Sequence, residues 1–474
     1  MVVKRTIAQE LDPIFKARSV AVIGASNTPP KWGYSIMERL VKGGFQGPVY
    51  PVNPKETSVM NLRSYPDVRS IPQRVDLAVF VIPAHLVPRA MEDAIASGIR
   101  GALVISAGFA ESGDAGYKLQ EQLTAIVRSS GIRMIGPNCN GMWSSDTSVS
   151  LSSPKPIKPG SVAFISQSGA FGGMLVSQAE EKGYGLSKFV SSGNQADLNE
   201  ADYIAYLAQD PSTKVIVLYM EGVRDGRKFM EAAKNAVRHK PIIIYKPGSS
   251  AIGTRAVQSH TGSMMMPDSL FDSLCKQVGI IRAKETSHLF DMAEALANAP
   301  LPPVPGIGII SMTGGQCVVS SDTCAQLGLD VPEIDQTTQR YLAQNVLADH
   351  APAPRNPIDI AGDFRTPLTF AEIAEAIAPL PSIGVLLISP PSQRSGAGAA
   401  ASEEAARRIA AIPLKFGKPV LALGMSPTAS PLAGSVAGIF QEAGIPRYQK
   451  PEDAARAAYA LVQYASIKAR ISLR

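Results

Sequence analysis

Residues 19–26 read Ser-Val-Ala-Val-Ile-Gly-Ala-Ser, an apolar run that stops at a glycine. A run of this kind is typical of a strand that is covered on both faces of a parallel sheet. In the turn at Gly24, backbone amides and a following helix N-terminus can approach a phosphate group. The third glycine of the usual dinucleotide-binding loop is missing, because a longer loop continues to Gly33. The stretch therefore predicts a strand and a phosphate-sized turn without identifying a ligand.

Similar apolar runs recur along the whole chain, separated by longer helical patterns and ended by Gly, Ser, Asn or Pro. A first group of candidate strands comprises residues 19–23, 48–52, 77–82, 102–106 and 133–135. A second group comprises residues 161–165, 186–190, 215–219 and 241–245, and a third comprises 306–310, 384–388 and 419–423. Strands that alternate with helices in this way indicate an α/β protein with parallel, doubly wound sheets.

Length and proline content divide these groups into domains. A chain of 474 residues is suited to about three domains of ordinary size. Residues 152–159 contain three prolines and residues 299–305 contain four, which makes both segments poor interiors for a helix or a strand. We therefore predict three doubly wound domains, at residues 1–150, 158–300 and 305–474.

Composition and charge exclude several classes of protein. The net charge of +6 is small, and Lys and Arg do not gather into basic blocks with aromatic residues, so no nucleic-acid partner is expected. The spacings of the four cysteines match neither a zinc site nor a redox pair, which indicates free thiols in a reducing compartment and no metal site. No apolar run resembles a signal peptide or a membrane span, and a cytoplasmic protein is expected.

One sequence element occurs twice. Ile-Ser-Gln-Ser-Gly at residues 165–169 is followed by Gly183, and Ile-Ser-Met-Thr-Gly at residues 310–314 is followed by Gly328, at the same offset of fourteen residues. Each copy predicts a strand, a tight turn of hydroxyl residues and glycine, and a helix closed by a glycine cap. The two turns are of the size that binds phosphate. Alternatively, the repeat reflects only the strand, turn and helix that any doubly wound fold repeats.

The segment after the second candidate strand reads Pro51-Val-Asn-Pro-Lys55. An NAD-binding fold is expected to have an acidic residue here, which holds the ribose hydroxyls. Lys55 instead favours a nucleotide with an additional ribose phosphate, such as NADP or coenzyme A. A solvated lysine in a turn is the simpler alternative, because exposed lysines are common.

Five motifs in the first domain occur in a characteristic order: LDPIFKARSVAVIGAS (11–26), YPVNPK (50–55), FVIPA (80–84), ISAGFAE (105–111) and GPNCNG (136–141). This order resembles the CoA-binding domain of NDP-forming acyl-CoA synthetases, a family similar to the succinyl-CoA synthetase α subunit. The resemblance implies a Rossmann-like CoA-binding domain followed by two flavodoxin-like domains. It also implies that the thiol of coenzyme A is directed toward the turn at 136–141. The contacts to coenzyme A that it implies come from Gly24, Ala25, Ser26, Asn53, Lys55, Ile82, Pro83 and Asn138.

One of the five histidines, His260, lies in a segment of small, flexible and hydroxyl-bearing residues, 248–263. We interpret this segment as a mobile loop that can carry a phosphoryl group on the imidazole between separate places. A structural or surface histidine is the alternative. Ser259-His-Thr-Gly262 resembles the phosphohistidine loop of the NDP-forming synthetases, and the resemblance implies that His260 is the phosphorylated residue.

A phosphohistidine requires groups that stabilise its negative charge and a carboxylate that orients the imidazole. We predict that helix N-termini at the two repeated turns bind the phosphoryl group. The predicted phosphate-binding residues are Ser166, Gln167, Ser168, Gly169, Thr313, Gly314 and Gly315. Glu221 matches the family glutamate that orients the histidine, and a surface glutamate is the alternative. Residues 191–197 and 356–359 also resemble the second and third family domains, and we assign no chemistry to them.

The resemblance spans nearly the whole chain and implies one subunit of an acid-thiol ligase. It implies that phosphate displaces CoA from an acyl-CoA, that His260 takes the phosphoryl group and releases the acid, and that ADP accepts the phosphoryl group to give ATP. The sequence has no ATP-grasp pattern and no G-x-x-x-x-G-K-S/T loop, so we expect a separate ATP-grasp β subunit that binds ATP or ADP with Mg²⁺. Two alternatives are a non-catalytic CoA-binding regulatory module and an NADP-dependent oxidoreductase. The identity of the acid and the choice between ADP and GDP stay open.

Overall fold

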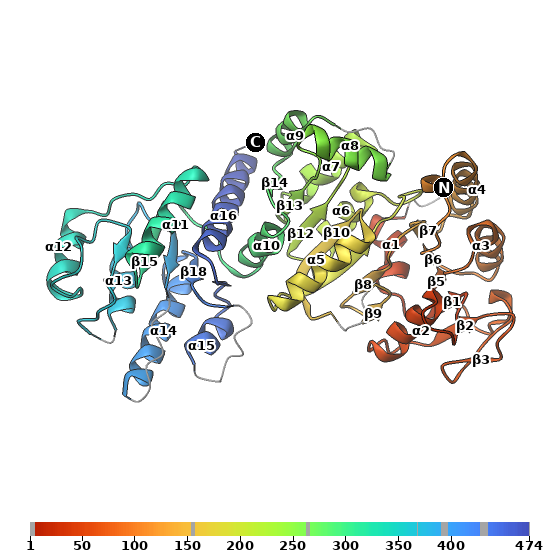
Figure 1. Cartoon of the computed structure of the whole chain (residues 1–474), viewed down its shortest axis with the longest axis horizontal. Coiled ribbons are helices and arrows are strands. Elements are labelled where there is room, and N and C mark those ends of the chain that lie inside the picture. Colours follow the sequence, from red (N-terminus) through yellow and green to blue (C-terminus); the bar gives the residue numbers. More distant parts are fainter. Residues whose placement is uncertain are drawn as a thin grey trace. The chain divides into compact units, whose positions relative to one another are not determined.

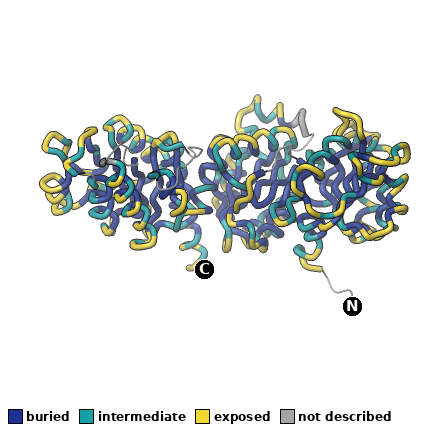
Figure 2. Tube along the Cα trace, turned by 90° about the horizontal axis from the view of Figure 1, so that it is seen from below, coloured by how far each residue is buried: buried dark blue, intermediate teal, exposed yellow. Residues whose placement is uncertain are grey.

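The computed structural model describes residues 5–152, 157–261, 266–366, 368–389, 397–426 and 435–473, without the side chains of residues 258–261, 397 and 398 (Figure 1). The chain forms two compact units, residues 1–180 with 184–282, and residues 181–183 with 283–474. In each unit, buried strands form the centre, and exposed residues lie on the surrounding helices and loops (Figure 2). No helix in the described ranges is long and apolar enough to cross a membrane.

The first unit begins with a five-stranded parallel sheet in the order β2-β1-β5-β6-β7. Its strands are β1 Val20–Ile23, β2 Val49–Val52, β5 Leu77–Phe80, β6 Gly101–Val104 and β7 Arg133–Ile135. The helices are α1 Ile7–Phe15, α2 Trp32–Lys42, α3 Val87–Ala96 and α4 Asp114–Ser130, and the short elements are β3 Ser58–Val59, β4 Leu62–Arg63, η1 Val68–Ser70, η2 Ala84–Leu86 and η3 Ala110–Ser112. Strands β1, β5 and β6 are buried along their whole length, which explains why their sequences are apolar throughout.

The second sheet of this unit has the order β14-β13-β12-β10-β11-β8-β9. Its parallel strands are β10 Pro159–Ser166, β11 Leu186–Ser191, β12 Val215–Tyr219, β13 Ile242–Tyr245 and β14 Ile281–Arg282, and the antiparallel strands are β8 Met142–Ser144 and β9 Val149–Ser150. The helices are α5 Gly169–Glu181, α6 Glu200–Gln209, α7 Gly226–Ala236, α8 Ala251–Thr261 and α9 Asp268–Val278. The turn at residues 136–141 connects β7 to β8, so it leads from the first sheet into the second.

The second unit contains a five-stranded parallel sheet in the order β16-β15-β17-β18-β19. Its strands are β15 Ile307–Ser311, β16 Ile358–Asp359, β17 Val385–Ile388, β18 Val420–Leu423 and β19 Arg447–Tyr448. The helices are α10 His288–Asn298, α11 Gly314–Gln326, α12 Gln336–Asn345, α13 Thr369–Ile377, α14 Ala397–Phe416, α15 Val436–Glu442 and α16 Pro451–Ser472. Buried side chains from α13, α14 and α15 form one core cluster of this unit, and side chains from α16 contribute to another.

The predicted α/β class with doubly wound parallel sheets is confirmed. Each of the candidate strands is present, and its ends lie within two residues of the predicted ones. The short strands β3, β4, β8, β9, β14, β16 and β19 were not predicted, because runs of two or three residues rarely show a periodicity. The boundary at residues 150–158 stays a prediction, because the first two sheets belong to one compact unit.

The repeated sequence element forms the same local structure twice. Helix α5 begins at Gly169 and helix α11 begins at Gly314, and both run for thirteen residues. Each helix ends two residues before a glycine with positive φ, which is +75° at Gly183 and +73° at Gly328. A left-handed residue at this position closes a helix and is accessible to glycine at little steric cost. The predicted strand, turn, helix and glycine cap are therefore present in both copies.

Arg133, at the start of β7, ties the two sheets of the first unit together. Its guanidinium forms ion pairs with Glu10 on α1, with Asp197 in the loop after β11, and with Asp202 on α6. Asp197 also accepts a hydrogen bond of 2.8 Å from the backbone N–H of Met134. These contacts hold the loop after β11 against the edge strand of the first sheet.

Candidate active site

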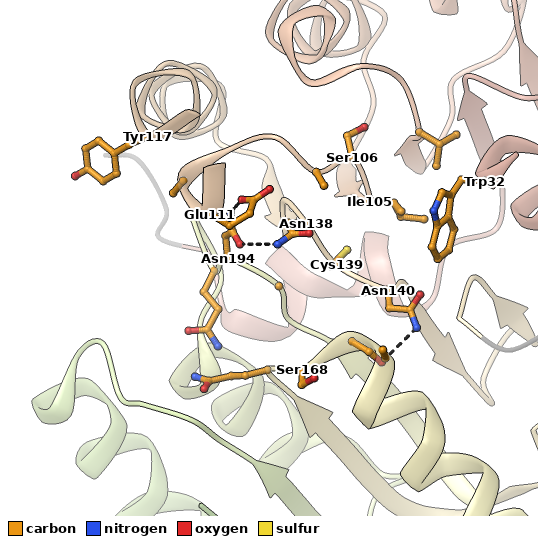
Figure 3. A pocket seen from close by; sticks show the side chains of 18 of the residues that line it. Trp32, Ile105, Ser106, Glu111, Tyr117, Asn138, Cys139, Asn140, Ser168 and Asn194 are labelled. Carbon is orange, nitrogen blue, oxygen red and sulfur yellow. Dashed lines mark hydrogen bonds between the residues drawn. The ribbon is translucent and has the colours of Figure 1, made fainter. Parts of the chain in front are cut away.

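A cavity of about 1090 Å³ lies in the first unit, between residues that follow strands of both sheets (Figure 3). The first sheet contributes residues after β5, β6 and β7, among them Ile82, Glu111 and residues 138–140. The second sheet contributes residues 167–170, 193–195 and 222–224, which follow β10, β11 and β12. Ligands of α/β proteins bind outside the carboxyl ends of parallel strands. This cavity is therefore the candidate active site.

The turn after β1 is shaped by two glycines. Gly24 has φ +98°, and a Cβ there would lie 2.7 Å from the carbonyl oxygen of Val81. Gly33, in the first turn of α2, packs directly on this turn, because a Cβ at Gly33 would lie 1.9 Å from the carbonyl oxygen of Gly24. Close packing of helix on turn is the task of the third glycine in dinucleotide-binding loops. Gly33 performs this task from a position later in the chain.

The predicted coenzyme A residues of β1 and β2 are connected to one another. The side-chain amide of Asn53 donates a hydrogen bond of 2.8 Å to the carbonyl oxygen of Ala25, and its Oδ1 accepts one of 2.8 Å from Lys55 N–H. Ser26 is buried, and its hydroxyl accepts a hydrogen bond from the Thr28 N–H. The side chain of Lys55 is exposed and forms no ion pair within the described part of the chain. It is therefore available to an anionic ligand.

Only two of the residues predicted to contact coenzyme A line the cavity itself, Ile82 and Asn138. Gly24, Ala25, Ser26, Asn53, Lys55 and Pro83 follow β1, β2 and β5 of the same sheet but lie outside the cavity wall. A ligand that reached all of these residues would extend along the carboxyl edge of the first sheet and end in the cavity. Coenzyme A, with a phosphorylated nucleotide at one end and a thiol at the other, has this form.

A chain of polar side chains supports the turn at residues 136–141 (Figure 3). The side-chain amide of Asn138 donates a hydrogen bond of 3.2 Å to Asn194, which in turn donates to Gln120 and Glu111. Glu111 also accepts hydrogen bonds from the N–H groups of Gly108 and Phe109. Burial acts to raise the pKa of Glu111, but the hydrogen bond from Asn194 and those from the backbone lower it, and the net shift is downward. Glu111 is therefore a carboxylate that is fixed in the cavity wall.

We assigned no role to Glu111 or Asn194 from the sequence, although both lie in motifs that resemble the family. Each motif follows a candidate strand, but nothing in the sequence indicated that the two side chains meet. Asn140 is a further link, because its side-chain amide donates a hydrogen bond of 3.3 Å to the carbonyl oxygen of Gly169 in the first turn of α5. The predicted thiol end of coenzyme A and the predicted phosphate turn at 166–169 therefore meet in one cavity.

Gln167 connects the turn after β10 to Glu221. Its Oε1 accepts hydrogen bonds from the N–H groups of Glu221 and Gly222, at 2.5 and 3.0 Å, and its Nε2 donates one of 2.8 Å to the Gly222 carbonyl. Its own backbone N–H donates to the carbonyl oxygen of Tyr219. The carboxamide of Gln167 thus both accepts from and donates to the backbone after β12. These contacts fix the position of the turn, and binding of a phosphoryl group by Gln167 stays a prediction.

The other residues around this turn are closely packed. Ser166 is buried, and its hydroxyl donates a hydrogen bond of 2.6 Å to the carbonyl oxygen of Ser168. Glu221 is only 4 % exposed, and its carboxylate forms a hydrogen bond with the Tyr219 hydroxyl. Burial, followed by the charge of Glu221, raises the pKa of Tyr219, so the phenol stays neutral and donates. Ser168 and Gly169 line the cavity, with the N-terminus of α5 behind them.

The segment around His260 differs from the prediction. We expected a loop over residues 248–263, but residues Ala251–Thr261 form helix α8. The hydroxyl of Ser250 accepts a hydrogen bond of 3.1 Å from the Gly253 N–H, and the Thr254 hydroxyl donates to the carbonyl oxygen of Gly248. A serine before a helix satisfies an N–H group that has no partner inside the helix, and this explains the helical start. His260 belongs to the last turn of α8, and its side chain lies outside the described residues.

The predicted phosphate turn of the second unit, at residues 313–315, differs from the turn at residues 166–169 in the charges around it. The hydroxyl of Thr313 caps α11 by accepting a hydrogen bond from the Gln316 N–H. A Cβ at Gly314 would lie 2.8 Å from the carboxylate oxygen Oδ2 of Asp359, at the end of β16. The first turn of α11 therefore already has a carboxylate beside it. Binding of a phosphoryl group by Thr313, Gly314 and Gly315 stays a prediction.

Comparison with known families defines the class of this protein. Residues 18–144 match the family described as a CoA binding domain, and residues 159–296 match the succinyl-CoA ligase like flavodoxin domain. The first match covers the sheet that holds Gly24 and Lys55, and the second covers α5, Glu221 and α8. Among the described residues, no group of three or more His, Cys, Asp and Glu side chains is arranged to hold a metal ion.

Individual relatives define the family more closely. The chain is 38% identical to the α subunit of acetate-CoA ligase [ADP-forming] II of Pyrococcus furiosus, over 96% of this chain and 98% of that one. It is 41% identical to acetate-CoA ligase [ADP-forming] I of Archaeoglobus fulgidus, over 74% of this chain and 51% of that protein. A solved structure from Ca. Korarchaeum cryptofilum, described as a dinucleotide forming acetyl-coenzyme A synthetase 1 in complex with phosphate and ADP, aligns with a TM-score of 0.84 at 31% identity, covering 98% of this chain and 99% of that one. The chain belongs to the family of ADP-forming acyl-CoA synthetase α subunits, as the resemblance in its sequence implied.

Proposed function

We propose that the chain is the subunit of an acid-thiol ligase that binds CoA and carries phosphohistidine. The ligase interconverts acyl-CoA, phosphate and a nucleoside diphosphate with a carboxylic acid, CoA and a nucleoside triphosphate. One observation supports this most directly. In the first unit, the turn predicted to receive the thiol of CoA and the N-terminus of α5 share the same cavity. A thioester and a phosphate bound there would be adjacent.

The first step is the attack of phosphate on the thioester. An oxygen of hydrogen phosphate forms a bond to the carbonyl carbon, the carbon–sulfur bond breaks, and the phosphate proton passes to the leaving thiolate. The products are an acyl phosphate and CoA. The contribution of this chain is to hold both reactants in line, with the positive end of α5 close to the phosphate oxygens.

In the second step, one ring nitrogen of His260 attacks phosphorus, the bond between phosphorus and the carboxyl oxygen breaks, and the acid leaves. The other ring nitrogen keeps its proton, and we assign Glu221 to accept a hydrogen bond from it and so orient the ring. Glu221 is suited to this role, because it is buried at the strand end that Gln167 holds next to the α5 turn. ADP then takes the phosphoryl group from His260, and the reverse direction activates an acid at the expense of ATP.

We assign the binding of the nucleotide, and its phosphoryl transfer with His260, to a partner subunit. The sequence contains neither an ATP-grasp pattern nor a phosphate-binding loop of the G-x-x-x-x-G-K-S/T type. The chain spans about half of its Archaeoglobus relative but nearly all of the separate Pyrococcus α subunit. We infer a separate ATP-grasp β subunit that binds ADP or ATP with Mg²⁺ and sets the choice of purine. A cytoplasmic location remains a prediction.

Radiolabelled phosphate tests this function, because the first two steps need no nucleotide. The chain is incubated with acetyl-CoA and labelled phosphate, and CoA release and protein-bound label are measured. We expect label that is stable in base and lost in acid, and we expect His260→Asn to abolish it, because only a nitrogen of that ring can hold the phosphoryl group.

The matched control is His239→Asn, which changes an exposed histidine just after α7. This variant should be labelled like the wild-type chain. Label that persists in His260→Asn would show that another residue carries the phosphoryl group. A wild-type chain that released no CoA from any thioester in a panel of acyl-CoAs would contradict the proposed function.

A further inference from the structure

The charges that line the cavity are unevenly arranged. Among the described residues of its wall, two have acidic or basic side chains, Glu111 and Arg224. Glu111 belongs to the side of the first sheet, where three hydrogen-bond donors hold its carboxylate. Arg224 belongs to the side of the second sheet, in the loop after β12. The cavity therefore has an anionic side and a cationic side.

The cationic group of Arg224 makes few contacts with the described part of the protein. Its Nη1 donates one hydrogen bond of 3.3 Å, to the carbonyl oxygen of Gln195. In the ranges that the structure describes, its guanidinium forms no ion pair within contact distance, its charge interacts with the buried Glu200 carboxyl, and the residue is exposed and lines the cavity. A guanidinium offers five N–H groups in a plane, and this geometry matches two oxygens of a phosphate or a carboxylate.

The backbone near Arg224 is fixed against the start of α5. The carboxamide of Gln167 binds the N–H and the carbonyl group of Gly222, two residues before Arg224. Gln167 is also two residues before Gly169, where α5 begins. The same side chain thus holds the loop of Arg224 next to the helix end, so that both sources of positive potential are on one side of the cavity.

Phosphate is the substrate that requires such an arrangement. Hydrogen phosphate enters the cavity as a dianion and is repelled by the Glu111 carboxylate. A helix N-terminus offsets about half a unit charge, which is less than the dianion carries. A full positive charge beside that helix end would concentrate phosphate on the α5 side, opposite the wall that holds the thioester.

We propose that Arg224 binds the phosphate substrate at the N-terminus of α5 and positions one of its oxygens for attack on the acyl-CoA thioester. The proposal rests on the proposed function and assigns a residue to its first step. In that step the carbon–oxygen bond forms, the carbon–sulfur bond breaks, and the phosphate proton passes to the leaving thiolate, so Arg224 only binds and orients the phosphate. A carboxylate on the acyl group is the other anion that a guanidinium could hold, and the experiment separates the two.

The experiment measures CoA release from acetyl-CoA at varied phosphate and at varied acetyl-CoA, for Arg224→Gln, Arg224→Lys and the wild-type chain. For Arg224→Gln we expect KM for phosphate to rise about tenfold or more, as for loss of a charge-assisted hydrogen bond, and KM for acetyl-CoA to stay unchanged. Arg224→Lys, which keeps the charge without the planar fork, should give an intermediate KM for phosphate.

Arg227→Gln is the matched control, because Arg227 is exposed on α7, lies outside the cavity wall and changes the net charge equally. Its KM for phosphate should equal that of the wild type. A measurement without turnover accompanies the kinetics: inorganic phosphate should raise the Tm of the wild type and of Arg227→Gln, but not that of Arg224→Gln.

Three outcomes would overturn the proposal. An unchanged KM for phosphate in Arg224→Gln, an equal rise in Arg227→Gln, or a rise confined to acyl-CoAs that carry a second carboxylate would each assign Arg224 another role. Failure of the proposed function is distinguishable, because the wild-type chain itself would then show no phosphate-dependent release of CoA.

Discussion

Cys139 lies in the wall of the cavity, within the turn that we expect to receive the thiol of coenzyme A. Burial raises the pKa of Cys139 to about 12, and its Sγ donates a hydrogen bond to the carbonyl oxygen of Val104. A thiol in this state is neither a nucleophile nor a competitor for the thioester at neutral pH. The expectation of free thiols is confirmed, and the other three cysteines, Cys275, Cys317 and Cys324, are buried as well.

This environment predicts slow cysteine chemistry. Burial raises the pKa of each of the four thiols to about 12, so at pH 8 only about one in 10⁴ is a thiolate. A thiol reagent at pH 8 should therefore modify none of them in the native chain and all four in urea. Because the folded pKa lies above the unfolded value, the folded state should lose stability as pH rises from about 8.5 toward 12. Rapid labelling of a native thiol would contradict the burial.

At the scale of single elements, the packing of α2 on the turn after β1 governs the coenzyme A side of the first sheet. The helix begins at Trp32, which lines the cavity, and approaches the turn through Gly33. The carbonyl oxygen of Gly24 occupies the space of a Cβ at Gly33, at 1.9 Å, so no small adjustment can accommodate a methyl group. The same contact therefore sets the position of α2, the shape of the turn after β1, and the carboxyl edge of the first sheet where coenzyme A is expected to bind.

Gly33→Ala tests this contact. We expect a loss of about 1–3 kcal/mol in the free energy of unfolding, because overpacking displaces α2, and a weaker affinity for CoA. Urea unfolding and calorimetry with CoA measure the two effects. Gly226→Ala is the control, since a Cβ at Gly226 meets nothing within 4 Å at the start of α7, and its stability should be equal or slightly higher. Equal stability of the two variants would exclude the proposed packing role.

At the scale of the first unit as a whole, the cavity depends on how its two sheets are held together. Arg133 supplies an ion-pair centre for Glu10, Asp197 and Asp202, three carboxylates from separate elements. The side chains of Asp197 and Asp202 are only 9% and 6% exposed. Removing the cation from a buried carboxylate costs free energy of folding. Arg133 is therefore needed to hold the loop after β11 against β7.

Arg133→Met should therefore lower the free energy of unfolding by roughly 3 kcal/mol and weaken CoA binding, because the buried Asp197 carboxylate loses its cation and residues 193–195 of the cavity wall shift, whereas Asp202 keeps its ion pair with Lys228. Arg100→Met is the control, since its ion pair with Asp76 is at the surface, with the Arg100 side chain 62% exposed, and exposed pairs contribute about 0–1 kcal/mol. Urea unfolding and CoA calorimetry on both variants provide the measurement. Similar losses of stability in the two variants would contradict the role of Arg133 in holding the two sheets together.

The parallel strands, the repeated strand, turn and helix, and the order of the motifs follow from local composition. A strand that is covered on both faces needs consecutive apolar residues, and a helix that closes in a left-handed residue favours glycine, so both leave a direct trace in the chain. Local composition was misleading for residues 251–261, where small and hydroxyl residues indicated a loop and the Ser250 cap supports a helix.

The wall of the cavity was decided by tertiary contacts. Glu111 and Asn194 are far apart in sequence and meet because the carboxyl ends of the two sheets face one another in the first unit. Gln167 and Gly222 meet because β10 and β12 are paired neighbours in the second sheet. Side chains of this kind show no periodicity and no spacing of their own, since their partners belong to other strands. The position of Arg224 in the cavity wall likewise depends on the packing of the loops around it, which places its guanidinium against the Gln195 carbonyl group.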